Sequence, residues 1–222
     1  VVHDAVRGAG KRIKPNATAA ESTVTNQITS FDSDGFTTSN STDTGANSNN
    51  YVAWNWKAGT GQGSSNTDGS INTTYTSVNT TSGFSISQYT GTGSNATVGH
   101  GLGVAPKMIM IKCLSHSAEW NVYYGDATDF LILNENNATS DDATRWNDTA
   151  PTTSVFSIGT NGNVNTSGRT YVAYCFAEKT GFSKIGTYPS NNNANGNFVY
   201  TGFKPNWILI KSIGSGGYNW QL

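Results

Sequence analysis

The chain has 222 residues, of which 12% are charged, and its formal net charge is −1. This near-neutral balance gives no electrostatic basis for binding nucleic acid or an anionic membrane surface. No apolar run approaches the roughly 18 residues that a membrane-spanning helix needs, so membrane insertion is not expected either. Gly, Asn, Thr and Ser make up almost half of the chain and aromatic residues another 11%, a composition that favours turns and pleated strands over helices.

Three strands are expected in the first quarter of the chain. Residues 23–31 and 36–39 are rich in Thr, Ser and Phe and flank a short acidic turn. Residues 51–57 then alternate between apolar and other side chains. The apolar face of this third strand carries Trp54 and Trp56, which we therefore expect to lie in a core.

Further strands are expected at residues 84–90, 108–112, 120–124 and 207–211. Residues 108–112 are apolar on both faces, which predicts a strand that is covered on both sides and lies centrally in its sheet. Turn residues separate these strands at short intervals. The pattern predicts an all-β fold of tandem antiparallel β-sandwich modules, with a jelly-roll-like arrangement.

The chain repeats itself out of phase with its ends. The phrase YVAWNWK at residues 51–57 returns as YVAYCFA, and PKMIMIK at residues 106–112 returns as PNWILIK. The last three residues, Trp220 to Leu222, match the run that begins at Trp120, and the first residues of the chain read as the continuation of that run. The chain is therefore expected to be a piece of a longer array of repeats.

This repeat divides the chain into four parts. Residues 1–57 are expected to form the C-terminal part of one repeat unit, and residues 58–82 a linker or insertion rich in Gly, Ser, Thr and Asn. Residues 83–180 are expected to form a complete β-sandwich repeat, and residues 181–222 the N-terminal part of the next. The alternative is a structural unit that is permuted relative to the sequence unit.

Little in the sequence points to catalysis. His100 lies between glycines, but its counterpart in the other copy is Tyr200, so the fold does not require an imidazole there. A polysaccharide-degrading enzyme needs two carboxylates about 5–9 Å apart, and the adjacent Asp141 and Asp142 would point to opposite faces of an extended chain. We therefore expect no enzyme activity, no catalytic residue, no metal site and no cofactor.

The two cysteines do not recur between the copies. Cys113 is matched by Ser212, and Cys175 is matched by Asn55. A disulfide that belonged to the repeated fold would be expected to repeat with it, so these residues are expected to be buried thiols or substitutions on a polar face rather than a bridge.

Trp146 is the candidate glycan-binding residue. Sugars stack on exposed aromatic rings, whereas an aromatic residue that both copies keep, or exchange for another apolar residue, is typical of a core. Trp146 stands apart because its counterpart, near Thr25 and Asn26, is polar. If one residue stacks on a glycan, we expect it to be this one.

Several phrases of the chain resemble a known family. They lie at residues 4–11, 31–36, 51–59, 83–86, 100–106 and 200–205. Taken together, they are similar to a repeated domain of uncharacterised function in tail-fibre and other virion-associated proteins of marine tailed bacteriophages. The resemblance covers nearly all of the chain except residues 58–82.

The resemblance implies a structural virion protein, a module of a phage tail fibre or appendage that recognises glycans on the host surface. The expected location is the extracellular virion particle. The expected partners are further copies of the chain in a homotrimer or larger assembly, other virion proteins and host-surface glycans. The alternative is a carbohydrate-binding or adhesin repeat of a bacterial surface protein, located at the bacterial cell surface.

Overall fold

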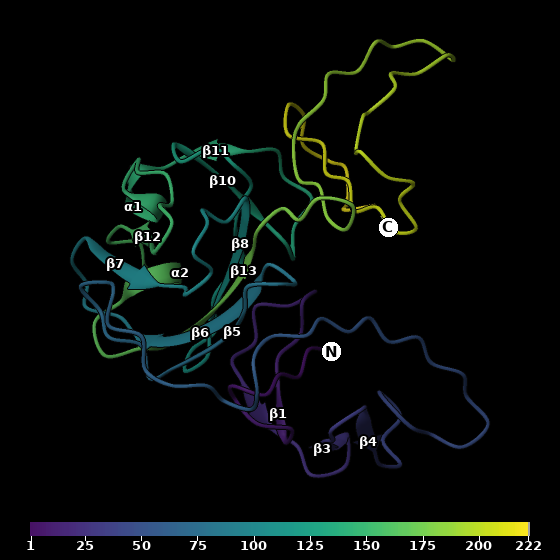
Figure 1. Cartoon of the computed structure of the whole chain (residues 1–222), viewed down its shortest axis with the longest axis vertical. Coiled ribbons are helices and arrows are strands. Elements are labelled where there is room, and N and C mark those ends of the chain that lie inside the picture. Colours follow the sequence, from purple (N-terminus) through teal and green to yellow (C-terminus); the bar gives the residue numbers. More distant parts are fainter. Residues whose placement is uncertain (222) are drawn as a thin grey trace.

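A seven-stranded antiparallel sheet forms the centre of the molecule in the computed structural model, which describes residues 1–221 (Figure 1). Leu222, the last residue of the predicted repeat match, lies outside the described residues. In order across the sheet, the strands are β11 (Ser140–Asp141), β10 (Asp129–Ile132), β9 (Asn121–Tyr123), β8 (Met108–Cys113), β13 (Thr170–Phe176), β6 (Phe84–Thr90) and β5 (Tyr75–Asn79).

A second layer covers one face of this sheet. It consists of the two-stranded sheet of β7 (Ala96–Gly99) and β12 (Val155–Ile158), together with two single-turn helices, α1 (Ala143–Trp146) and α2 (Gly162–Asn165). The main core lies between the layers, where side chains from β8 and β13 pack against Val98, Phe156 and Ile158. The predicted all-β, antiparallel sandwich is therefore confirmed.

The continuous apolar run predicted to be a central strand is β8, the fourth strand of seven. Its alternate side chains serve two cores, because Ile109 and Ile111 face the main core while Met110 packs against a second core on the opposite face. Burial on both faces explains why its sequence is apolar throughout. No helix among residues 1–221 is long and apolar enough to cross a bilayer.

The N-terminal segment covers the opposite face of the seven-stranded sheet. Val6 and Ile13 are each 1% exposed and form the second core with Trp120, Val172 and other side chains of the sheet. Short strands brace this segment and the chain that follows it: β1 (Lys11–Arg12) pairs with β2 (Ser22–Thr23), and β3 (Ile28–Phe31) pairs with β4 (Phe36–Thr38).

Two of the predicted strands are absent from the described part of the chain. Residues 51–57 have no strand pairing, and residues 207–211 make only the isolated bridge from Ile210 to Gln221. The prediction that Trp54 and Trp56 lie in a core is also wrong for this structure, since they are 54% and 45% exposed. An extended segment becomes a stable strand only beside a partner strand, and these segments have none.

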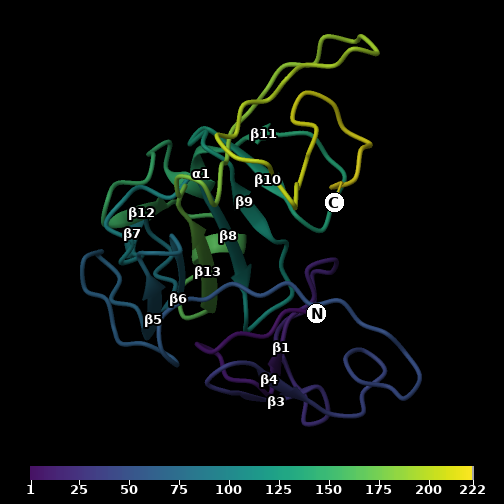
Figure 2. The same cartoon turned by 45° about the vertical axis from the view of Figure 1, so that its right-hand side comes forward.

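Residues 58–82, predicted as a linker or insertion, contribute to the domain edge. They contain β5, which pairs with β6, and Ile71, which is 6% exposed and belongs to the main core. Of the segments on either side of residues 58–180, residues 24–57 run below and residues 181–221 above, and they meet at the rings of Trp56 and Trp207 (Figures 1 and 2). The assignment of these segments to neighbouring repeat units stays a prediction.

Candidate functional site

The structure places Trp146 in the core. Its side chain is 1% exposed at the end of α1, and its ring packs edge-on against Tyr123 at a centroid distance of 5.8 Å. A sugar could not reach either ring face without unfolding this end of the sandwich. Trp146 is therefore corrected from a glycan-binding candidate to a core residue.

Local interactions explain this position. Asp142 caps α1 by accepting a hydrogen bond from Thr144 N, and its carboxylate pairs with Arg145 at 3.0 Å. The guanidinium of Arg145 lies 4.0 Å from the ring centroid of Phe130. This capped turn directs Trp146 inward, and the polar counterpart near Thr25 reflects a segment that has no such turn.

The cysteines are buried, and they form no bridge, as predicted. Both thiols are free, and each residue is 0% exposed. Burial raises the pKa of Cys175 to about 12, so this thiol stays protonated and unreactive. Cys175 is a packing residue of the main core.

The histidine considered for catalysis also has a structural role. His100 is fully buried, where its Nδ1 accepts a hydrogen bond from Leu102 N and its Nε2 lies 3.2 Å from Thr152 O. Burial lowers its pKa, which favours the neutral ring that these two bonds require. No group of three His, Cys, Asp or Glu side chains within residues 1–221 could hold a metal ion.

The N-terminal segment docks on a loop of the sheet through its backbone. We call this the first docking contact, and it joins residues 14–21 to residues 112–120. Its bonds run from Trp120 Nε1 to Lys14 O at 2.8 Å, from Ala118 N to Thr18 O at 2.9 Å and from Glu21 N to Leu114 O at 2.9 Å. Backbone carbonyls are the acceptors in all three bonds, whereas the donors are two backbone amides and the indole of Trp120.

A buried lysine lies at the centre of the first docking contact. Lys112 is 0% exposed, and its ammonium donates to Thr18 O at 3.0 Å, Cys113 O at 3.1 Å and Ala118 O at 2.9 Å. These carbonyls use all three of its protons. Burial lowers the pKa of Lys112 to about 8. One acceptor belongs to the N-terminal segment, so the lysine ties that segment to the sheet.

A second buried charge holds the other end of the segment. Asp4 accepts hydrogen bonds from Arg7 N at 2.9 Å, from Arg7 Nε at 2.6 Å and from the Tyr174 hydroxyl at 2.6 Å. The Arg7 side chain is 1% exposed and also lies 3.3 Å from Glu21. Burial, with a contribution from Asp4, raises the pKa of Tyr174 well above its usual value, so its hydroxyl remains a donor.

A second docking contact, between residues 132–139 and residues 211–220, has the same pattern. Its bonds run from Trp220 Nε1 to Ile132 O at 3.1 Å, from Gly217 N to Asn136 O at 2.9 Å and from Thr139 N to Ile213 O at 3.2 Å. The donors and acceptors occur in the same order and with the same spacing on the segment side. In addition, Lys211 Nζ donates to Tyr218 O at 2.6 Å, as Lys112 donates to Ala118 O. The two docking contacts therefore join different parts of the chain through the same arrangement of hydrogen bonds.

Residues of both docking contacts line one cleft. Pro15 and Asn16 belong to the first docking contact. Residues 133–136, Asn219 and Trp220 belong to the second. The cleft has a volume of about 420 Å³. Its walls are more apolar than polar, with Pro15, Leu133 and Trp220 beside several asparagine amides and Glu135. Apolar surface with a few polar groups is typical of small-ligand sites.

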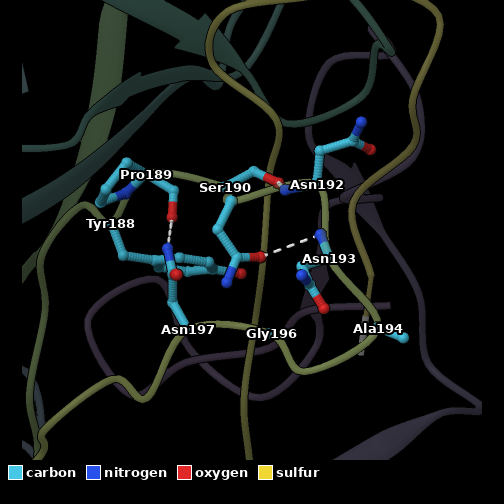
Figure 3. Close-up of a pocket in the computed structure, with 9 residues that line it drawn as sticks. Tyr188, Pro189, Ser190, Asn192, Asn193, Ala194, Gly196 and Asn197 are labelled. Carbon is cyan, nitrogen blue, oxygen red and sulfur yellow. Dashed lines mark hydrogen bonds between the residues drawn. The ribbon is translucent and has the colours of Figure 1, made fainter.

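An asparagine-rich loop at residues 188–197 forms a second hollow, of about 570 Å³ (Figure 3). Its amides hold the loop in shape, since Asn193 N donates to Asn191 Oδ1 at 3.1 Å and Asn197 Nδ2 donates to Pro189 O. Tyr188 lies at the start of the loop and is 47% exposed. The loop thus offers a ring and several amides to solvent, a combination that suits sugars.

Sequence reasoning missed both hollows. The signal for this loop is its run of Asn residues, which indicates a loop but not its hollow. The cleft is formed by segments far apart in the chain, and only the match between Trp120 and Trp220 hinted at it.

Comparison with known proteins gives a family but no function. A family model described as a domain of unknown function (DUF7483) matches residues 1–222. The chain matches no curated protein and no solved structure. The chain therefore belongs to the DUF7483 family of domains of unknown function.

Proposed function

We propose that this chain is a structural virion protein, a module of a phage tail fibre or related appendage that associates with itself and recognises host-surface glycans. The observation that supports this most is the match between the first and second docking contacts. Contacts that recur in one geometry allow the same surfaces to be reused along an extended assembly. The resemblance of the sequence to tail-fibre repeats adds the virion setting.

The low charge of the chain fits this role. Contacts between neutral backbone and amide groups depend little on ionic strength, whereas ion pairs at an exposed surface are screened by salt. Several charged groups of the N-terminal segment are already paired, with Arg12 3.1 Å from Asp43 and Lys11 3.6 Å from Glu21. Recognition would therefore depend on hydrogen bonds and ring stacking.

The location of the chain tests this proposal. Virions of a tailed phage that encodes the chain would be purified by density gradient, digested and examined by mass spectrometry, and labelled with an antibody raised against residues 1–222. We expect peptides of the chain in the virions and label on the tail or its fibres. Peptides confined to the envelope fraction of a bacterium that encodes the chain would contradict the virion role and support the surface adhesin instead.

We expect Tyr188→Ala to weaken glycan binding about 5- to 10-fold, because an aromatic contact contributes about 1 kcal/mol. Binding would be screened on an array of bacterial surface polysaccharides, and the dissociation constant for the strongest glycan would be measured by calorimetry. Trp146→Phe is the matched control and should leave the constant unchanged, since Trp146 is buried. Equal affinity of the wild type and Tyr188→Ala would exclude the loop at residues 188–197, and a wild type that binds no glycan would exclude glycan recognition.

A further inference from the structure

Two segments of the chain carry almost all of its exposed apolar surface. Apart from Val104, every large apolar side chain that is well exposed within residues 1–221 lies in residues 1–57 or residues 181–221. Apolar surface gathered in this way marks an interaction site. The middle of the chain, by contrast, buries its apolar residues in two cores.

The exposed side chains match buried ones position by position. In each matched pair, one residue is at most 5% exposed in the sandwich, while its counterpart in a flanking segment is at least 37% exposed. The pairs are Val172 and Val52, Tyr174 and Trp54, Ile109 and Ile208, Ile111 and Ile210, and Phe156 and Phe36. The flanking segments thus have the sequence of interior strands without the neighbours that would bury them.

The matched strands show which neighbours are missing. In the sandwich, β13 pairs with β8, and Phe176 lies opposite Met108. Residues 51–57 correspond in sequence to β13, and residues 207–211 correspond to β8. Because β13 and β8 are neighbouring strands in the sandwich, each of the two segments has the sequence of a strand that could pair with the other. The rings of Trp56 and Trp207, which correspond to Phe176 and Met108, lie 5.9 Å apart.

Part of the sandwich pairing is already present in the C-terminal segment. Ile210 bridges Gln221 in antiparallel fashion, as Ile111 pairs with Asn121 between β8 and β9. The C-terminal segment therefore keeps one pairing of the position that β8 has in the sandwich.

Within one chain, the two segments meet where the ring of Trp56 lies beside that of Trp207. Beyond Trp56 and Trp207, residues 24–57 run along the lower side of the molecule and residues 181–221 rise on the upper side (Figures 1 and 2). The N-terminal segment is also held to the sheet by Lys112 and Asp4, which fixes where residues 24–57 begin. A second copy of the chain can supply the missing strand without disturbing the contacts of Lys112 and Asp4, and the contact between Trp56 and Trp207 would then form between copies.

We propose that residues 51–57 of one copy pair as an antiparallel strand with residues 207–211 of a second copy. The register follows β13 and β8, so that Ala53 lies opposite Ile210 and Asn55 lies opposite Ile208. Each copy has one segment of each kind, so the contact joins unlike surfaces and can continue from copy to copy. This strand exchange deepens the self-association of the proposed function but does not depend on a role in a virion or on glycans.

Disulfide trapping between full-length chains tests the proposal. Ala53→Cys would be made in a chain with one affinity tag and Ile210→Cys in a chain with another, and the two would be mixed and oxidised mildly. A second pair, Trp54→Cys with Leu209→Cys, covers the neighbouring ladder position, because consecutive antiparallel pairs alternate between the wider and the closer spacing. The native cysteines are buried and should not compete.

We expect at least one of these mixtures to give a covalent dimer that carries both tags. The matched control, Ala53→Cys with Ile208→Cys, is two positions out of register and should give at least tenfold less dimer, since diagonal positions are too far apart for a disulfide. Equal yields from control and paired mixtures would overturn the register. In a last test, one chain would carry both Ala53→Cys and Ile210→Cys. A disulfide that forms only within monomers, with no covalent dimer at any protein concentration, would overturn exchange between copies. Absence of any specific disulfide would overturn the proposal as a whole, and the virion experiment would be unaffected.

Discussion

Replacing Lys112 by Met should destabilise the fold by about 3 to 5 kcal/mol, because three buried carbonyls would lose their only charged donor. Met has a similar length and keeps the packing of the aliphatic stem, so the loss reports the hydrogen bonds rather than a cavity. Urea unfolding followed by tryptophan fluorescence measures the free energy of unfolding.

The repeat supplies a matched control for this prediction. Lys211 occupies the corresponding position but lies in a segment that is largely exposed, where its Nζ has one carbonyl acceptor, Tyr218 O. Lys211→Met should therefore change the stability by less than about 1 kcal/mol. Equal effects of the two substitutions would show that Lys112 is not the centre of the first docking contact.

Replacing Asp4 by Asn should cost about 3 kcal/mol, and the loss should be concentrated in the N-terminal segment. The change leaves the buried guanidinium of Arg7 with only Glu21 as a charged partner, and an uncompensated buried charge is strongly destabilising. Native-state hydrogen exchange should show the result: the amides of Ile13 and Glu21, which are bonded to Val2 and Leu114, should lose protection.

A surface ion pair gives the contrast for Asp4. Glu178 pairs with Lys184 at 3.0 Å in a setting open to solvent. Glu178→Gln should therefore change the stability by no more than about 1 kcal/mol. If Asp4→Asn leaves the exchange of Ile13 and Glu21 as slow as in the wild type, the N-terminal segment does not depend on this buried pair.

In the middle of the chain, the local sequence pattern was sufficient to predict where the strands lie. The continuous apolar run of β8 predicted a central strand, and the alternation in residues 84–90 predicted β6 with its observed bounds. Both strands have neighbours within the same sandwich, so their local pattern and their tertiary setting agree. The lack of a matching pattern around the cysteines also predicted that they form no bridge, and both are free.

The same reasoning failed where a strand has no neighbour. Residues 51–57 have a clearer alternation than β6, yet they remain unpaired because pairing is not a property of one segment. Trp146 was misplaced for a related reason: the comparison between copies assumed equivalent surroundings, but only one copy has the capped turn of α1. The docking contacts were not predicted because all their acceptors are backbone carbonyls, which leave no pattern in the sequence; only their Trp and Lys donors recur.

The central claim, that the chain assembles through surfaces which one copy leaves unsatisfied, is tested most directly by the molar mass in solution. Light scattering coupled to size exclusion would be recorded over a hundredfold range of protein concentration. The account predicts masses that rise above the 23.5 kDa of the single chain towards a trimer or larger assembly. A mass that stays at 23.5 kDa throughout this range would contradict it.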